Sequence, residues 1–175
     1  MARTLALPRP PAAISAAVAR FAPLAALVAA ALALIVAEFL TLREIVAVTA
    51  VPEGGRTSGG AHHGYALAVV GVAALPMSFG AVLGGSRPAS AALVVLGAVA
   101  LGIALVADLP SLNETGLIGR TYDLAEAHPG PGFWLELAGS VVLLLGGLAL
   151  LRIRVVEARV RSQQRHAERR RATES

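Results

Sequence analysis

Three carboxyl groups lie near the ends of long apolar runs instead of in the polar loops: Glu38, Asp108 and Glu136. A charge at that depth in lipid is unfavourable, and acidic side chains are too short to reach the surface as Arg does. We therefore expect the three groups to turn toward the bundle interior or to stay protonated. If they meet, they form one polar pocket that faces the outside of the cell, with Arg43 and Arg120 as partners. Such a pocket could bind a cation or an amine, or seat an external partner. Separate carboxyl groups, each wetted at the interface, would explain the same positions.

The imidazoles offer a second possible chemistry. His62, His63 and His128, with Glu126 or Asp123, could in principle collect a Zn²⁺ ion. His62 and His63 stand between glycines, however, and no second ligand spacing supports a site, so we interpret them as loop residues and expect no metal and no cofactor. The chain has no Cys, which excludes disulfides and thiolate metal sites. It also lacks the common phosphate-binding and hydrolase motifs, so we do not expect an enzyme.

Composition indicates the class of protein that must position these groups. The chain has 175 residues, of which 56% are hydrophobic and 15% charged, and its mean hydropathy is +0.70. Four windows reach the roughly 20 apolar residues that a helix needs to cross a bilayer. They are residues 21–42, 65–84, 90–109 and 132–151. We predict an all-α integral membrane protein, a four-helix transmembrane bundle over residues 21–151.

The segments between the windows define the loops. Residues 84–90 form a Gly/Pro turn that joins the second and third helices as a hairpin, whereas residues 43–64 and 110–131 form two extracytoplasmic loops. Within the first loop, IVAVTAV at residues 45–51 fits either a short strand or a continuation of the first helix. A signal peptide cleaved near residues 48–50 is an alternative to the first span, but its apolar run is longer than usual.

The distribution of Arg predicts the orientation. All fifteen basic residues are Arg; twelve lie on the side of the termini and the inner turn, and three on the side of the loops. Positive residues favour the cytoplasmic side, so the 1–20 segment and both termini should be cytoplasmic in a plasma membrane. Phe133 and Trp134, with Tyr65, fit an aromatic belt at the outer interface.

The basic tail, residues 152–175, has no Gly or Pro to end the last helix, so we expect a helical cytoplasmic stalk. Arg residues directly cytoplasmic of a span can hold anionic lipid headgroups, although fixing the topology would explain them equally well. The candidate lipid contacts are Arg152, Arg154, Arg159, Arg161, Arg165, Arg169, Arg170 and Arg171. No soluble part of the chain could present a basic groove, so nucleic acid is not expected as a partner.

Small residues should bring the helices together, because lipid is as apolar as Leu and gives no hydrophobic drive for association. On this basis we expect contact faces at Ala29, Ala33 and Ala37, at Gly80 and Gly84, and at Ala98 and Gly102. Packing within one bundle explains these faces better than a dimer, although a homo-oligomer remains open.

The stretch from Asp108 to Leu151, DLPSLNETGLIGRTYDLAEAHPGPGFWLELAGSVVLLLGGLALL, resembles the second half of small four-pass membrane proteins of GC-rich bacteria. Those proteins have no assigned activity, so the resemblance implies topology only. The absence of Lys and the abundance of Arg and Ala indicate GC-rich coding and a bacterial source. We expect an accessory, scaffolding or envelope-associated protein that acts through a membrane partner. The alternative is a subunit of a small-solute transporter or channel, although the middles of the four spans carry no charge.

Overall fold

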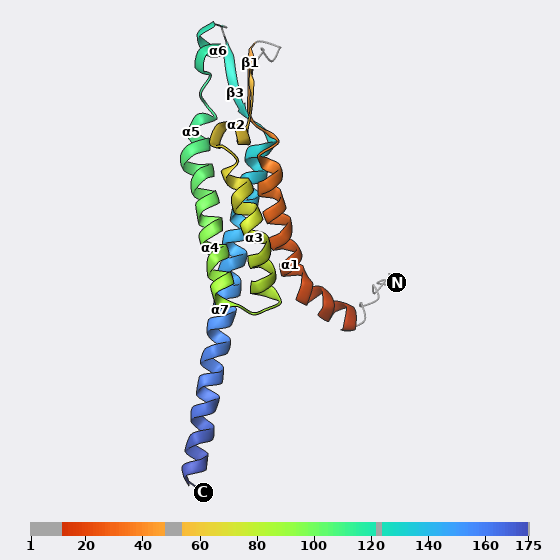
Figure 1. The fold of residues 1–175 in the computed structure, drawn as a ribbon, viewed down its shortest axis with the longest axis vertical. Helices are drawn as coiled ribbons and strands as arrows, with labels where there is room; N and C mark the ends of the chain where they lie inside the picture. The colour runs from red at the N-terminus through yellow and green to blue at the C-terminus, as the bar shows by residue number, and fades with distance from the viewer. Residues whose placement is uncertain (1–11, 48–53, 122–123, 175) are drawn as a thin grey trace, which may run out of the picture.

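The computed structural model describes residues 12–47, 54–121 and 124–174. Side chains at 12–20, 157–161 and 164–174 are not described. The chain is mostly helical, as the sequence predicts, and it is elongated, with the strands and short helices gathered into a cap at one end and the turn at residues 83–86 at the other (Figure 1).

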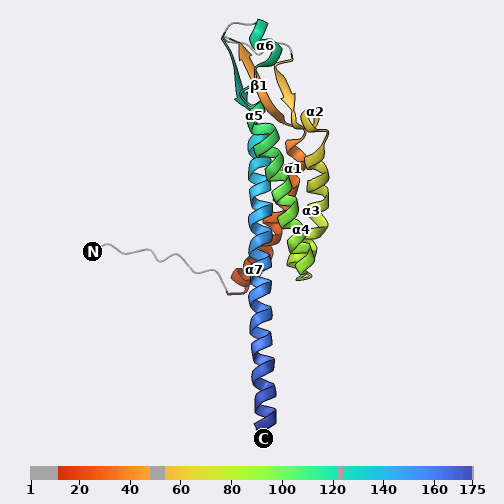
Figure 2. The same cartoon turned by 90° about the vertical axis from the view of Figure 1, so that its left-hand side faces the viewer.

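Four long helices make up the body of the molecule. They are α1 (Ala12–Ala37), α3 (Ala66–Val82), α4 (Arg87–Gly102) and α7 (Pro131–Glu174). Each packs against two neighbours in the order α1, α3, α4, α7 and back to α1, and α3 and α7 lie diagonally opposite with few contacts. Figure 2 shows α7 running past the other three as an unbroken rod toward the C-terminus. The tail therefore continues the last helix, as expected from the absence of Gly and Pro after residue 151.

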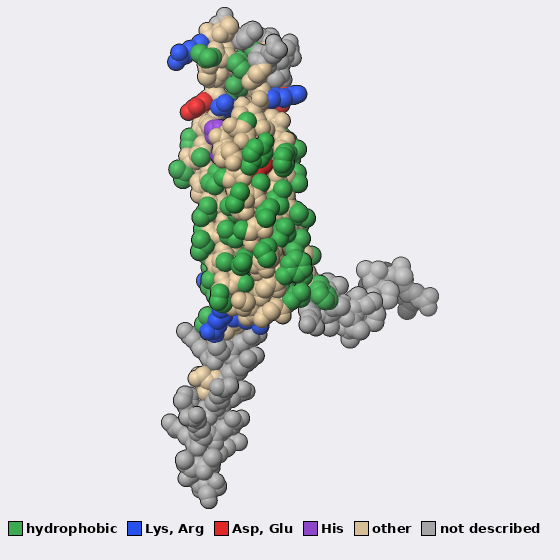
Figure 3. Space-filling model, in the orientation of Figure 1, with side chains coloured by type: hydrophobic (Ala, Val, Ile, Leu, Met, Phe, Trp, Pro, Cys, Tyr) green, Lys and Arg blue, Asp and Glu red, His purple; other side chains and the backbone are tan. Residues whose placement is uncertain are grey.

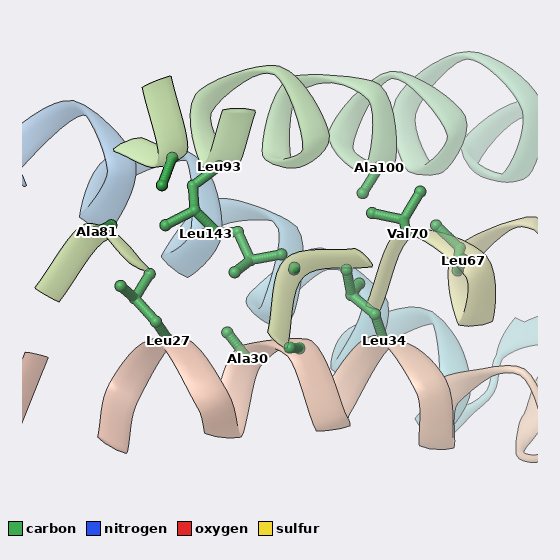
Figure 4. Packing of buried hydrophobic residues seen from close by; sticks show 12 residues of the cluster. Leu27, Ala30, Leu34, Leu67, Val70, Ala81, Leu93, Ala100 and Leu143 are labelled. Carbon is green, nitrogen blue, oxygen red and sulfur yellow. The ribbon is translucent and has the colours of Figure 1, made fainter. Parts of the chain in front are cut away.

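The core of the bundle is built from aliphatic and small side chains of all four helices. Leu27, Leu34, Leu67, Leu93 and Leu143 are its largest fully buried members, and Ala residues fill the space between them (Figure 4). Because Ala has no bulk beyond Cβ, the helix backbones can approach closely, which maximises van der Waals contact.

The contact faces predicted from small residues are partly wrong. On α1, Ala37 is buried as expected, but Ala33 is half-buried and Ala29 is exposed. The buried face of this helix also includes Leu27, Ala30, Ala31 and Leu34. On α4, Ala98 is exposed and a Cβ atom at Gly102 would meet nothing, whereas Gly97 touches the backbone of α7. Small residues are so common in this chain that their spacing does not single out a face.

Beyond Gly102, α4 continues in a wider winding. Residues Ile103–Asp108 form a π-helix, η1, followed by α5 (Leu109–Ser111) and, after a break, α6 (Gly116–Thr121). Pro110 has no N–H for the carbonyl four residues earlier, and its ring crowds that carbonyl. A locally widened turn, which contains one extra residue, relieves this conflict and rotates the residues that follow it around the helix axis.

A small antiparallel sheet, which the all-α prediction did not include, forms the cap. Its order is β2 (Arg56–Ser58), β1 (Thr41–Ala47), β3 (Ala125–Pro129). The first span was predicted to reach residue 42, but α1 ends at Ala37 and a strand begins at Thr41. The strand alternative for residues 45–51 holds for 45–47, and the remaining four positions lie outside the described residues.

The sheet brings the end of α1 to the beginning of α7. β1 directly follows α1, β3 directly precedes α7, and the two strands pair from Arg43 with Pro129 to Ala47 with Ala125. Gly132 lies where α7 starts, and a Cβ atom there would stand 2.9 Å from the carbonyl oxygen of Thr41. Below the sheet, Leu42, Leu112 and Phe133 form a second, smaller apolar cluster.

Two helical stretches, beginning at Arg87 and at Pro131, are long and apolar enough to cross a membrane. Phe21–Ala37 and Ala66–Val82 are also apolar but shorter. On the face shown in Figure 3, hydrophobic side chains cover the bundle, while charged side chains and His gather above it and Arg below it.

Candidate functional site

A group of ionisable side chains lies where the cap meets the bundle. It consists of Glu38, His62, His63, Asp108 and Glu136, and we call it the outer cluster. The three carboxyl side chains are almost completely buried, with exposures of 0% for Asp108 and 1% for Glu38 and Glu136. Glu38 follows α1, Asp108 ends the π-helix that continues α4, and Glu136 lies on α7. The short helix α2 provides the two His residues, and the start of α3 donates a hydrogen bond to Glu38.

Glu38 directly follows the last residue of α1, and its carboxyl group caps the start of α3. Its Oε1 accepts hydrogen bonds from the backbone N–H of Leu67 at 2.6 Å and of Ala68 at 3.3 Å. The N-cap residue of α3, Tyr65, offers no side-chain hydrogen bond, so Glu38 satisfies donors that the helix itself leaves free. A carboxylate is also well placed at the positive end of a helix dipole.

His62 and His63 end the short helix α2 (Gly59–His63). Ser58 caps the start of this helix, because its side chain accepts a hydrogen bond from the N–H of Ala61. The N–H of Gly60 donates to the carbonyl of Glu38 at 2.9 Å. Gly64, with φ of 65°, ends it in the left-handed conformation that Gly adopts at little cost. The two His residues therefore lie in an ordered helical turn held against Glu38, and the interpretation as plain loop residues is wrong.

Asp108 is the last residue of the π-helix η1. In this segment Ala104 and Asp108 are buried, whereas Leu105 and Val106 are exposed. The widened winding therefore directs the carboxyl group of Asp108 toward the bundle interior. π-helical turns occur frequently at functional sites.

Glu136 lies in the second turn of α7, one residue before Leu137, which packs on the smaller apolar cluster. The pairing of β1 with β3 fixes the beginning of α7 beside the end of α1, with the Gly130 N–H donating to the Leu42 carbonyl at 2.8 Å. The sheet thus sets the depth at which Glu136 enters the cluster.

Within the outer cluster, the imidazoles stand between the carboxyl groups. His63 Nδ1 lies 3.4 Å from Glu38 Oε1, and His63 Nε2 lies 3.7 Å from Asp108 Oδ2. His62 Nε2 lies 3.4 Å from Asp108 Oδ1. One donor atom from each of His63, Asp108 and Glu136 lies within 4.8 Å of the other two.

Most polar atoms of the outer cluster have no hydrogen bond within the described residues. They are Glu38 Oε2, both ring nitrogens of His63, both carboxyl oxygens of Asp108, and Glu136 Oε1. The buried hydroxyl groups of the bundle behave differently, because each donates to a helix carbonyl. These are Ser78, Ser90, Ser111 and Ser140. Buried polar atoms are normally bonded, so the exceptions at one place call for a physical explanation.

The partners predicted for the carboxyl groups are wrong, although the three carboxyl groups do come together. Arg43 directs its guanidinium to the backbone, with Nη1 donating to the carbonyls of Ser111 at 2.7 Å and Glu114 at 3.0 Å. Arg120 lies exposed on α6. No ion pair found among the described residues joins either Arg to the outer cluster.

The cluster also differs from an outward-facing pocket, because its carboxyl groups are covered. The other residues considered for a metal site do not join it: His128 and Glu126 form an exposed pair on β3, 3.8 Å apart, and Asp123 lies outside the described residues. Sequence reasoning found the carboxyl groups and the histidines separately. The common depth of Glu38, Asp108 and Glu136, next to a loop that carries two His residues, was the sequence feature that could have placed the carboxyl groups and the histidines in one site.

At the other end of the bundle lie the first Arg residues of the tail. Arg152 is exposed. Arg87 Nη2 donates to the carbonyl of Arg154 at 2.9 Å, which joins the start of α4 to α7. The side chains of Arg159, Arg161, Arg165, Arg169, Arg170 and Arg171 lie outside the described residues.

Comparison of the chain with protein-family models, with curated proteins and with solved structures gave no match.

Proposed function

We propose that the chain is a four-pass membrane protein with a cytoplasmic basic tail and an extracytoplasmic cap, and that it acts as a non-catalytic accessory or envelope-associated subunit. The observation that carries the membrane assignment is the distribution of side chains along the bundle. Apolar side chains point outward between a polar cap and an Arg-bearing end, which is the pattern of a protein surrounded by lipid.

Outward-facing apolar side chains occur on each of the four long helices. Examples are Leu32 and Val36 on α1, Val69 and Val72 on α3, Val95 and Val99 on α4, and Val142 and Leu145 on α7. In water such a surface would be a large aggregation-prone patch, because monomeric soluble proteins rarely expose more than a few hundred Å² of contiguous apolar area. Lipid, or a membrane partner, removes that cost.

The lengths of the helices are compatible with four crossings. α3 has 17 residues, and this equals the lower limit of about 17 residues for a spanning helix. α4 has 16 residues, but its helical path continues through η1. α1 has 26 residues, and Phe21–Ala37 is an apolar stretch within it. Short spans are accommodated by local thinning of the bilayer.

Aromatic side chains support the placement of the outer interface. Trp134 and Tyr65 are exposed near the cap, and Phe39, also exposed, lies with its ring centroid 5.8 Å from that of Tyr65. Phe133 was expected in this belt but is buried in the smaller apolar cluster. Exposed aromatic rings at one level favour a headgroup boundary there.

The outer cluster favours binding over catalysis. Its carboxyl groups are covered by α2 and the cap, so a substrate would have no direct access to them, and the described residues offer no nucleophile with an adjacent base. A rigid cap on a small bundle fits a subunit that other envelope proteins contact. An ion-transporting subunit is the second candidate, because buried ionisable residues in membrane helices often mark ion pathways.

Reporter fusions test the topology. Fusions at Ser175 and Gly85 should report the cytoplasm, and fusions at Gly59 and Asn113 should report the outside. A cytoplasmic signal at Gly59 would exclude the four-pass arrangement.

Purification from native membranes tests the role. The accessory proposal predicts a partner at fixed stoichiometry, whereas ion flux through the pure protein in liposomes would support the transport candidate. If the protein is recovered alone and the liposomes are tight, the accessory role is contradicted.

The tail is proposed to contact anionic lipid headgroups at the cytoplasmic face. Each basic residue near such a surface contributes about 1 kcal/mol at low ionic strength. The full-length protein with Arg165, Arg169, Arg170 and Arg171 changed to Gln should retain less anionic lipid on purification. Equal retention by this variant and the wild type would contradict the contact.

A further inference from the structure

We propose that the outer cluster binds one divalent transition-metal ion of the zinc type, with His63, Asp108 and Glu136 as ligands. These residues supply one nitrogen and two oxygen donors from three separate elements, all within 4.8 Å of one another. This combination is a ligand set that Zn²⁺ and related ions prefer.

The unsatisfied atoms point to a missing cation. Both oxygens of Asp108 and Oε1 of Glu136 are buried and accept from no N–H or hydroxyl donor within the described residues; the carboxyl groups of Asp108 and Glu136 instead lie against each other. Leaving such acceptors unbonded is unfavourable, and two neighbouring carboxyl groups repel one another when both are ionised. A divalent ion between them satisfies the oxygens and balances two negative charges at once.

The separations suit a metal after a small adjustment. Zn²⁺ binds His nitrogen and carboxylate oxygen at about 2.0–2.2 Å, which in a tetrahedral site places donors about 3.4 Å apart. His63 Nε2 and Asp108 Oδ2 are already 3.7 Å apart. Rotation of the Glu136 side chain, which is not held by a hydrogen bond at Oε1, would complete the approach.

Glu38 has the arrangement expected behind a metal-binding His. Its Oε1 lies 3.4 Å from His63 Nδ1, on the ring atom opposite the one that faces Asp108. A metal-bound His commonly donates its other ring N–H to a carboxylate, which fixes the ring and makes it a better ligand. Because the same oxygen accepts the N–H groups of Leu67 and Ala68, Glu38 is itself fixed in place.

The ligand set discriminates between classes of ion. Ca²⁺ and Mg²⁺ prefer six or more oxygen ligands, mostly carbonyl, carboxylate and water. The central ligand here is an imidazole, a nitrogen donor that Ca²⁺ and Mg²⁺ do not favour and Zn²⁺ does. Zn²⁺, with Mn²⁺ and Fe²⁺ as chemically similar competitors, therefore fits best.

The histidines also mark a way in from the outside. Side-chain exposure falls from 31% at His62 to 12% at His63 and 0% at Asp108. His62 Nε2 lies 3.4 Å from Asp108 Oδ1, so it can receive an ion at the rim and pass it to the buried carboxyl group. Through this route, which is lined by metal-binding side chains, the ion would enter the site from the extracytoplasmic side.

The test uses the full-length protein in detergent, stripped with a chelator and titrated with Zn²⁺. Metal content by elemental mass spectrometry should reach one ion per chain, and Zn²⁺ should raise the melting temperature. Co²⁺ in place of Zn²⁺ should give the visible absorption of a low-coordinate site. His63→Gln, Asp108→Asn and Glu136→Gln should each remove the stoichiometric binding, and Glu38→Gln should weaken it about 10- to 100-fold.

The matched controls are His128→Gln and Glu126→Gln, since these residues form an exposed His–Glu pair 3.8 Å apart on β3. Both should bind Zn²⁺ like the wild type. Asp108→Asn should keep the metal-free melting temperature or raise it, because it removes a buried charge, while losing the shift that Zn²⁺ causes. This pair of results separates lost binding from lost folding.

A second measurement needs no variant. Zn²⁺ should protect His63 in the wild-type protein from an acylating imidazole reagent and leave His128 reactive. The proposal is overturned if the wild type holds no stoichiometric metal, if His128→Gln loses binding as much as His63→Gln, or if protection is equal at the two residues.

Discussion

The outer cluster and the middle of the bundle are buried to the same degree but are built on opposite principles. In the middle, small residues let the helix backbones approach one another closely, as at Gly97 on α4 against the backbone of Leu144 on α7. In the outer cluster, Glu38, Asp108 and Glu136 occupy positions of equally low exposure with few bonds to satisfy them. Packing stabilises the middle of the bundle. The outer cluster, in contrast, holds several potential ligand atoms close together at a cost in stability.

The difference shows where the fold can tolerate change. Close packing of helices fails abruptly when an atom is added, because the neighbouring backbone has no space to move into. The cluster should tolerate neutral isosteric changes and lose mainly its capacity to bind. Three predictions test this contrast, from the largest expected effect to the smallest.

Replacing Gly97 by Val should cause the largest loss of stability. A Cβ atom at this position would contact the backbone N of Leu144 and come within 2.8 Å of its Cα. Overpacking of this kind should cost about 3 kcal/mol of unfolding free energy. Thermal unfolding in detergent measures the effect.

The control is the same change at Gly102, on the same helix, where a Cβ atom would meet nothing within 4 Å. Gly102→Val should stay within about 0.5 kcal/mol of the wild type. Equal effects at the two glycines would mean that the middle of the bundle does not depend on close approach.

In the outer cluster, Glu38 combines both roles, because it caps α3 as well as facing His63. Glu38→Ala leaves the N–H groups of Leu67 and Ala68 without their acceptor and should cost about 2 kcal/mol. Glu38→Gln keeps an acceptor oxygen and should cost less than about 1 kcal/mol. If Glu38→Gln destabilises as much as Glu38→Ala, charge and not capping dominates at this position.

The smallest effect concerns Arg43, which lies beside the outer cluster without pairing with it. Arg43→Ala removes two hydrogen bonds to backbone carbonyls, those of Ser111 and Glu114, and should cost about 1 kcal/mol. Arg120→Ala, on an exposed residue, should stay within about 0.5 kcal/mol of the wild type.

A double-mutant cycle on thermal stability sharpens this result. Arg43→Gln and Glu136→Gln should be additive within about 0.5 kcal/mol, because no ion pair joins the two side chains. A coupling above 1 kcal/mol would show that Arg43 neutralises the carboxyl group after all.

Part of the site could be predicted from the sequence. The positions of Glu38, Asp108 and Glu136 near the ends of their apolar runs indicated that they lie at one level, because a helix rises by a fixed distance per residue. The partners could not be predicted, because Arg43 and His63 both lie in the first loop, and only the local fold decides which one turns inward. Arg43 was predicted as the partner because of its positive charge, whereas in the structure α2 places the imidazole of His63 beside the carboxyl groups.

The sequence by itself determined the apolar helices, the distribution of Arg and the break points at Gly and Pro, since these depend on composition and on local backbone preference. Tertiary structure alone decided three things: the sheet that fixes α1 beside α7, the π-helical turn that directs Asp108 inward, and the helix faces that touch. Each depends on contacts between residues far apart in the chain. Strand pairing joins Arg43 to Pro129, and the face used by α4 is fixed by where α7 lies, which the spacing of Ala and Gly along one helix does not specify.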